Sequence, residues 1–191
     1  MKNLIKKITG LSIASIIMFC FAEAQNVAIG EPTYGGTGCP AGSLSGEVSR
    51  DGSEIFIQFG SFIVESGRSS RHRIDRGSCS FTIPITVPEG YSVALLAQSD
   101  FSVNVERGAS VQRDVEIFYA GARFENQSKI FRGPLSQDLQ EVYPEPEAGV
   151  VWTPCGKSVN LRMNMSLLTQ GSASAVMRGV NMKVVQWKKC E

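Results

Sequence analysis

Apolar and polar residues alternate with a period of two along several stretches of this chain. The clearest run has polar residues and one proline between the apolar positions Cys79, Phe81, Ile83, Ile85 and Val87. A second run of this kind extends from Val159 to Leu167. Strict alternation puts every second side chain on one face, so each run predicts a β-strand with one face against a core. Because proline lacks an N–H, Pro84 is expected at an unpaired edge or at a bulge.

Turn residues divide the rest of the chain into further short strands. We expect strands at residues 47–50, 55–59, 91–97, 101–105, 111–119 and 176–187, with Asp51-Gly52 joining the first two as a hairpin. Residues 25–46 are rich in Gly, Pro, Ser and Thr and predict an irregular lead-in. Helical periodicity is nearly absent, and only Leu135 to Val142 is expected to form one short helical turn. Many short strands without a repeat or linker predict an all-β fold, a single antiparallel β-sandwich.

The first 24 residues have the pattern of a secretory signal peptide. Three lysines precede an apolar stretch centred on Leu11 to Phe21, and Ala22-Glu23-Ala24 provides a small-x-small cleavage site. Cys20 offers an alternative as a lipoprotein cysteine, but Phe19 is a poor neighbour for a lipobox. We therefore expect a signal peptide at residues 1–24, a single domain at residues 25–191, and a secreted protein, with the periplasm or cell surface as alternatives.

Charge and hydropathy exclude two classes of partner. Removal of the signal peptide would leave 16 basic against 17 acidic residues, without the positive charge typical of nucleic-acid binders. No later apolar run approaches the length of a membrane-spanning helix. The sequence thus predicts neither a nucleic-acid partner nor a membrane span.

Four cysteines remain after the signal peptide, and an even number in an exported chain predicts two disulfides. Zinc is the alternative, but there is no C-x-x-C pair and the chain has one histidine, so no metal site is predicted. Three pairings are possible. We favour Cys39–Cys79 with Cys155–Cys190, because each pair brackets a strand-rich segment and the two loops stay independent.

The strongest charge feature is a basic segment between two predicted strands. Its candidate anion-binding residues are Arg68, Arg71, His72, Arg73 and Arg76. Arginine forks match carboxylate, sulfate or phosphate geometry, so an anionic surface polymer is a conceivable ligand. The simpler interpretation is a solvated loop that keeps the protein soluble.

Two other features have both a structural and a functional interpretation. Trp152 and Trp187 lie shortly before Cys155 and Cys190 and either pack their indole rings on a disulfide or form a sugar-stacking platform. The acidic, proline-rich segment 141–147 is more typical of a stiff surface loop than of a metal site, because prolines hold its carboxylates apart.

Catalytic patterns are weak. His72 stands among arginines, and there is no G-x-S-x-G elbow for a serine nucleophile. Paired-carboxylate hydrolysis stays open, since pairing is invisible for the scattered Asp51, Asp75, Asp100, Asp114 and Asp138. We predict a protein without cofactor that binds a surface polysaccharide or another extracellular protein, or has a structural role. A secreted hydrolase and an inhibitor of another protein are the alternatives.

Six short motifs also occur in a distinctive order around the four cysteines. They are Gly36-Thr-Gly-Cys39-Pro40 with Ser43, Arg76-x-x-Cys79, Pro88-Glu-Gly90, Arg132-Gly-Pro134, Trp152-x-Pro-Cys155-Gly156 and Trp187-Lys-Lys-Cys190. In this the chain resembles a family of small secreted fungal and bacterial proteins catalogued as a domain of unknown function. The resemblance implies a secreted, disulfide-bonded β domain over nearly the whole mature chain. It implies no activity, cofactor or binding residue.

Overall fold

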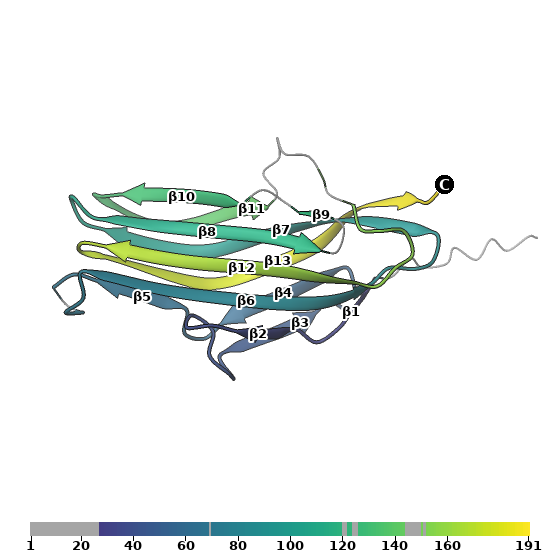
Figure 1. Ribbon diagram of the computed structural model, residues 1–191, viewed down its shortest axis with the longest axis horizontal. Coiled ribbons are helices and arrows are strands. Elements are labelled where there is room, and N and C mark those ends of the chain that lie inside the picture. Colours follow the sequence, from purple (N-terminus) through teal and green to yellow (C-terminus); the bar gives the residue numbers. More distant parts are fainter. Residues whose placement is uncertain (1–26, 69, 120–121, 124–125, 144–149, 151) are drawn as a thin grey trace, which may run out of the picture.

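The protein folds as two antiparallel β-sheets packed face to face, as the computed structural model shows (Figure 1). The structure describes residues 27–68, 70–119, 122–123, 126–143, 150 and 152–191. The proposed signal peptide and residues 144–147 of the acidic segment lie outside these ranges. Within these ranges no helix has the length and apolar character needed to cross a membrane.

The sheet nearer the viewer in Figure 1, here called the front sheet, is built around three long strands. Its strands are β1 (Ala28–Ile29), β2 (Thr33–Gly35), β6 (Ile74–Thr86), β8 (Ser110–Tyr119), β9 (Ala122–Arg123), β10 (Gln127–Arg132) and β12 (Val159–Gln170). The order is β1-β6-β12-β8-β10, with β2 also on β6 and β9 on β8.

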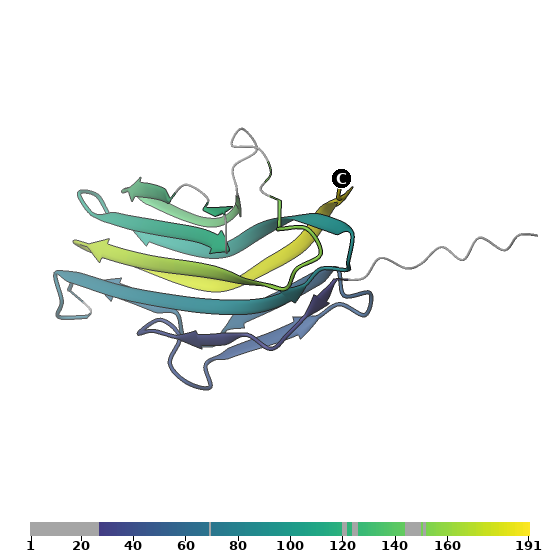
Figure 2. The same cartoon turned by 45° about the vertical axis from the view of Figure 1, so that its right-hand side comes forward.

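The other sheet, the back sheet, lies behind it, and Figure 2 shows the two layers from an oblique angle. Its strands are β3 (Leu44–Val48), β4 (Glu54–Phe59), β5 (Ile63–Ser66), β7 (Tyr91–Val105), β11 (Leu135–Tyr143) and β13 (Ala173–Lys189). The order is β11-β7-β13-β4-β3, with β5 also on β13. The predicted all-β sandwich and the β3–β4 hairpin are confirmed.

The core fills the space between the inner faces of the sheets. On β8 and β12, alternate residues are buried, as the period of two predicts. The largest side chains with almost no exposure include Phe62, Phe81, Phe101, Met163, Leu167 and Met177. Full burial of one such side chain stabilises the fold by about 1.5–3 kcal/mol, so this layer is the main source of stability.

Both predicted disulfides are present in the favoured pairing. The first disulfide joins Cys39 to Cys79 on β6, with 5.4 Å between the Cα atoms. The second disulfide joins Cys155 to Cys190, with 6.0 Å between the Cα atoms.

The glycines before Cys39 allow the chain to approach β6 closely. Gly36 has a φ of 146°, and a Cβ there would lie 2.2 Å from the Ser78 carbonyl oxygen. A Cβ on Gly38 would lie 2.4 Å from the Phe62 ring, and the Gly38 N–H donates to the Ser78 carbonyl at 2.8 Å. Larger residues would push the segment away from β6 and from its disulfide partner.

Three predictions of secondary structure were wrong. Residues 25–46, which were expected to be irregular, contain β1, β2 and the start of β3. Residues 91–97 and 101–105 belong to the single strand β7, because Ser99 continues the inward-facing series as a fully buried residue whose hydroxyl bonds to Tyr143 at 3.1 Å. Residues 135–142 are not a helical turn but most of β11, which pairs with β7 along its full length. The inward positions of β11 include the charged residue Glu141, which hid the alternation from sequence analysis.

Pro84 of β6 lies opposite the gap between the short strands β1 and β2 rather than at a free edge. It pairs with Asn160 of β12 on one side, and its carbonyl accepts from the Gly30 N–H at 2.8 Å on the other. The N and C=O of one strand residue point the same way, so the missing N–H faces the segment between β1 and β2.

A buried polar cluster connects the sheets where β8 and β10 approach β11. Arg113 of β8 is 2% exposed, forms an ion pair with Glu141 of β11, and lies over the Tyr143 ring at 5.2 Å from its centroid. Lys129 of β10 donates to Glu141 at 2.7 Å, and the Tyr143 hydroxyl donates to it at 3.1 Å. Burial raises the pKa of Tyr143 above its usual range. The charges of this cluster compensate one another within the sandwich.

Candidate functional site

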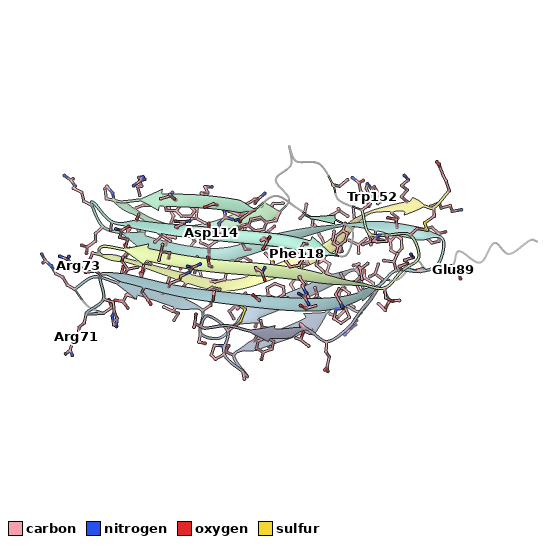
Figure 3. All side chains as sticks on the ribbon, in the orientation of Figure 1. Arg71, Arg73, Glu89, Asp114, Phe118 and Trp152 are labelled. Atoms are coloured by element: carbon pink, nitrogen blue, oxygen red, sulfur yellow. A yellow bond between two sulfur atoms is a disulfide. The ribbon has the colours of Figure 1, made fainter. Side chains whose placement is uncertain are left out.

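The structure divides the predicted basic residues between a loop and a strand. Arg68, Arg71, His72 and Arg73 lie in the loop between β5 and β6, which crosses from the back sheet to the front sheet. Its base is closed by the Gly67 N–H, which donates to the His72 carbonyl at 2.6 Å. All four side chains are exposed, and Figure 3 shows Arg71 and Arg73 at one end of the sandwich.

Arg76 lies apart from this loop, on the solvent-facing side of β6 opposite Leu168. Asp75 separates it from the loop and accepts hydrogen bonds from the backbone N–H groups of Glu65 and Arg76, both at 2.9 Å. Asp75 therefore anchors the loop to β5. Anion binding by this set stays a prediction.

Sequence analysis missed a groove on the outer face of the back sheet. The larger part encloses about 530 Å3 over β4, β13, β7 and β11. A smaller part of about 280 Å3 adjoins it, and Val176 lines both.

Strand register places the lining side chains in rows across the groove. Gln140 of β11 is paired with Asp100 of β7, which is paired with Gly179 of β13, and Gly179 is paired with Gln58 of β4. At about 4.8 Å between strands, this row is roughly 14 Å wide. The next row contains Asn181 paired with Phe56. Amides, a carboxylate and a phenyl ring thus share one surface.

The floor of the groove is shaped by a β-bulge in β13. Register shifts between Met177 and Gly179, so Arg178 is the extra residue, and its side chain forms an ion pair with Asp138 of β11. Gly179 has no side chain, so the groove is deepest over this residue, in the middle of its floor. Bulges re-aim side chains in this way beside binding sites.

Hydroxyl and amide groups line the smaller part. Ser102 and Asn104 of β7 are flanked by Ser136 of β11 and Ser174 of β13. In the larger part, Asn181 Oδ1 is buried and has no hydrogen-bond partner among the described residues. An unsatisfied acceptor is costly in a folded protein and is typical of a place where water or ligand binds.

Phe56 is the groove residue that the sequence could have revealed. In the run Ile55 to Phe59, the residues at 55, 57 and 59 are buried, whereas Phe56 is 41% exposed. An aromatic residue out of phase with the buried series is a signal for a surface role. The polar groove residues are ordinary for solvent-facing positions, and the apolar ones belong to the alternation of their strands, so neither kind carries such a signal.

The two tryptophans are poorly placed for a sugar-stacking platform. Trp152 and Trp187 are both half-buried, and Trp187 packs against the core. The Trp187 ring meets Tyr91 edge to face, with 6.0 Å between centroids. Figure 3 shows Trp152 near the end of the molecule opposite Arg71. This arrangement favours the packing interpretation.

Three of the scattered aspartates lie on the outer faces of the sheets, Asp114 on the front sheet and Asp100 and Asp138 on the back sheet. On the front sheet, Asp114 accepts hydrogen bonds from Gln112 at 3.1 Å and from Ser166 at 3.2 Å. Burial opposes its ionisation, but hydrogen bonds from Ser128, Gln112 and Ser166, together with Arg113, outweigh burial and lower the pKa of Asp114. No group of three or more His, Cys, Asp or Glu in the described ranges is arranged to hold a metal ion.

In the groove, Asp100 and Asp138 are diagonal neighbours on paired strands. A glycosidase would need one of two such carboxyl groups as a general acid in a buried, apolar setting. Asp138 has a 75% exposed side chain and is ion-paired with Arg178. The groove therefore suits binding better than hydrolysis.

Fold and groove define a class: a disulfide-bonded β-sandwich with a polar groove on one sheet. A family model described as a domain of unknown function (DUF4360) matches residues 25–190. The chain belongs to this family, as the motif order around the cysteines indicated.

A relative in the fungus Arthroderma benhamiae is named an uncharacterized secreted protein. It is 25% identical over 181 residues, which cover 88% of this chain and 74% of the relative. The prediction of a secreted protein is confirmed, and this chain is a secreted β-sandwich protein.

Two solved structures are similar to this chain at low identity. TmCBM61 in complex with β-1,4-galactotriose has 7% identity and a TM-score of 0.36, covering 81% of this chain and 88% of that one. A structure titled "CBM4 structure and function" has 14% identity and a TM-score of 0.23, covering 83% and 86%. Likeness at this level carries no conclusion about what this chain binds.

Proposed function

We propose that this protein is a non-catalytic carbohydrate-binding protein that holds a neutral polysaccharide chain in the groove of the back sheet. The observation that carries the proposal is the row of hydrogen-bonding side chains beside the exposed ring of Phe56, inside a groove that crosses four strands.

The chemistry of the lining matches that of a sugar chain. Amides offer donors and acceptors, and carboxylates offer strong acceptors, so Gln58, Gln140 and Asp100 can pair with the hydroxyl groups of a pyranose ring. The C–H face of such a ring is apolar and can cover the exposed part of Phe56. A mostly preformed surface with a few convergent polar groups is the usual form of a ligand site.

The shape of the groove favours the middle of a chain over its end. The row from Gln140 to Gln58 crosses β11, β7, β13 and β4, and the smaller part continues the groove over β7, β11 and β13. An extended ligand could therefore contact successive rows. The Arg178–Asp138 ion pair stands beside it and can donate to a hydroxyl from the guanidinium.

The test is affinity electrophoresis and calorimetry of the mature protein with neutral polysaccharides such as galactan, xylan, mannan and mixed-linkage β-glucan. Wild-type protein should bind at least one of them. Phe56→Ala and Gln140→Ala should each weaken that binding about tenfold, since each removes a contact worth about 1–1.5 kcal/mol.

The matched control is Ile130→Ala, which removes a 50% exposed apolar side chain from the front sheet. It should leave binding unchanged. The proposal would be contradicted if the wild-type protein bound none of the polysaccharides in the panel. It would also be contradicted if Phe56→Ala bound as tightly as the wild type.

A further inference from the structure

Four turns meet at the end of the sandwich that carries the basic loop. They lie at residues 67–73, 106–109, 133–134 and 171–172 and connect β5 to β6, β7 to β8, β10 to β11 and β12 to β13. Only the first of them was identified as a candidate from the sequence. Figure 3 places Arg71 and Arg73 at this end.

Backbone hydrogen bonds hold these turns together. The Gly171 N–H donates to the Arg73 carbonyl at 3.0 Å, and the Gly133 N–H donates to the Ala109 carbonyl at 3.2 Å. The Glu106 N–H donates to the Ser172 carbonyl at 2.9 Å. The backbone that carries Arg73 is thus fixed relative to the neighbouring turns.

The turns enclose a hollow of about 670 Å3 on the front-sheet side of this end. Its lining includes Arg73, Ile74, Ser110, Arg132 and Gln170, and it contains no Asp or Glu. Gln170 is paired with Ile74 on one side and with Ser110 on the other, and Ser110 is paired with Arg132. The two arginines therefore stand on opposite sides of a polar row.

These two arginines differ from three other cations on the strands of the sandwich. Arg113, Lys129 and Arg178 each form an ion pair with a carboxylate. Within the described part of the chain, no carboxylate lies within 4.0 Å of the charged nitrogens of Arg73 or Arg132. Among the described residues, no ion pair balances their positive charge.

We propose that this hollow is a second binding site, which takes an acidic polysaccharide whose carboxylate or sulfate groups pair with Arg73 on one side and with Arg132 on the other. A guanidinium fork matches either anion with two parallel hydrogen bonds. The volume lies within the range of pockets that hold small ligands, so a whole sugar unit fits beside the charged group. Ser110 and Gln170 can then pair with its hydroxyls.

This site is independent of the proposed groove. The hollow is lined from the front sheet and the groove from the back sheet. An acidic polysaccharide can thus bind at the hollow whether or not a neutral one binds in the groove, and Phe56→Ala should leave acidic binding unchanged.

The experiment measures binding of the mature protein to polygalacturonate, dextran sulfate, neutral dextran and double-stranded DNA across a series of salt concentrations. Wild-type protein should bind one of the acidic polysaccharides more tightly than dextran or DNA, and binding should weaken as salt screens the arginines. The polymer that binds better identifies the charged group as carboxylate or sulfate.

Variants separate the hollow from a general positive field. Arg73→Gln and Arg132→Gln should each reduce affinity about tenfold, because each removes a charged hydrogen-bonding partner. Their effects should be roughly additive, since the two arginines lie on opposite sides of the hollow and contact separate groups of the polymer. The matched control Arg107→Gln removes the same charge from an exposed position nearby that does not line the hollow, and it should change affinity by less than about twofold.

Three results would overturn the proposal. One is a wild-type protein that binds neither acidic polymer at low salt. Another is a loss with Arg107→Gln equal to that with Arg73→Gln, which would show a diffuse basic surface. The third is DNA binding as tight as polysaccharide binding, which would show attraction to any polyanion.

Discussion

The buried cluster around Arg113 and Glu141 offers the sharpest test of how the two sheets are held together. The Glu141 side chain is 12% exposed and accepts from Arg113, Lys129 and the Tyr143 hydroxyl. Glu141→Gln keeps the shape of the side chain and removes its charge. Arg113, whose side chain is 3% exposed, then becomes a buried cation without a counter-charge.

The expected loss is about 3–5 kcal/mol in the free energy of unfolding, the usual cost of removing one partner from a buried ion pair. For a domain of this size, that corresponds to a fall of roughly 6–20 °C in melting temperature. Lys129→Met should cost less than about 1 kcal/mol, because the Lys129 side chain is 56% exposed and its ion pair is solvent-screened.

The assay is urea unfolding with both disulfides intact, followed by tyrosine and tryptophan fluorescence. The double variant Arg113→Met/Glu141→Leu is the control, because replacing both charges with apolar groups leaves neither one buried alone. It should be much more stable than the sum of the single losses implies. A loss below about 1 kcal/mol for Glu141→Gln, or strict additivity in the double variant, would refute the reasoning.

Two further predictions concern Asp51 and the disulfides. Hydrogen bonds from the hydroxyls of Ser49 and Ser53, and from the Ser53 N–H, lower the pKa of Asp51 from its ordinary 3.8 to about 2. Its contribution to stability should be present above pH 3.8 and lost as pH falls towards 2. An NMR titration should give a midpoint near 2 that rises in Ser49→Ala, and a wild-type midpoint near 3.8 would contradict this. Mild reductant without denaturant should open the second disulfide before the first. Cys155 is exposed and Cys190 is half-buried, whereas both cysteines of the first disulfide are buried. Alkylation of the freed thiols followed by mass spectrometry checks the order.

The sequence by itself determined the class of fold and the position of most strands. Apolar and polar residues alternate from Cys79 to Val87 and from Val159 to Leu167 because one face of each strand is buried in the core. This pattern depends only on the residues of the strand itself, so it can be recognised in the sequence. The sequence favoured the observed disulfide pairing, because Cys39–Cys79 and Cys155–Cys190 close separate segments, but three pairings were possible and the structure chose between them. Export and the family were evident from the N-terminal segment and the motif order.

Tertiary structure decided everything that depends on neighbouring strands. Glu141 occupies an inward position of β11, where a charged residue does not fit the pattern of a strand. Its burial is possible because Arg113 and Lys129 of the front sheet form ion pairs with it. The groove required β4, β7, β11 and β13 to lie side by side, although they span residues 54 to 189. Arg132 is far from Arg73 in sequence, and only the meeting of the turns places both at one hollow. Such sites escape sequence analysis because strand order and register, which no local pattern specifies, decide which side chains become neighbours.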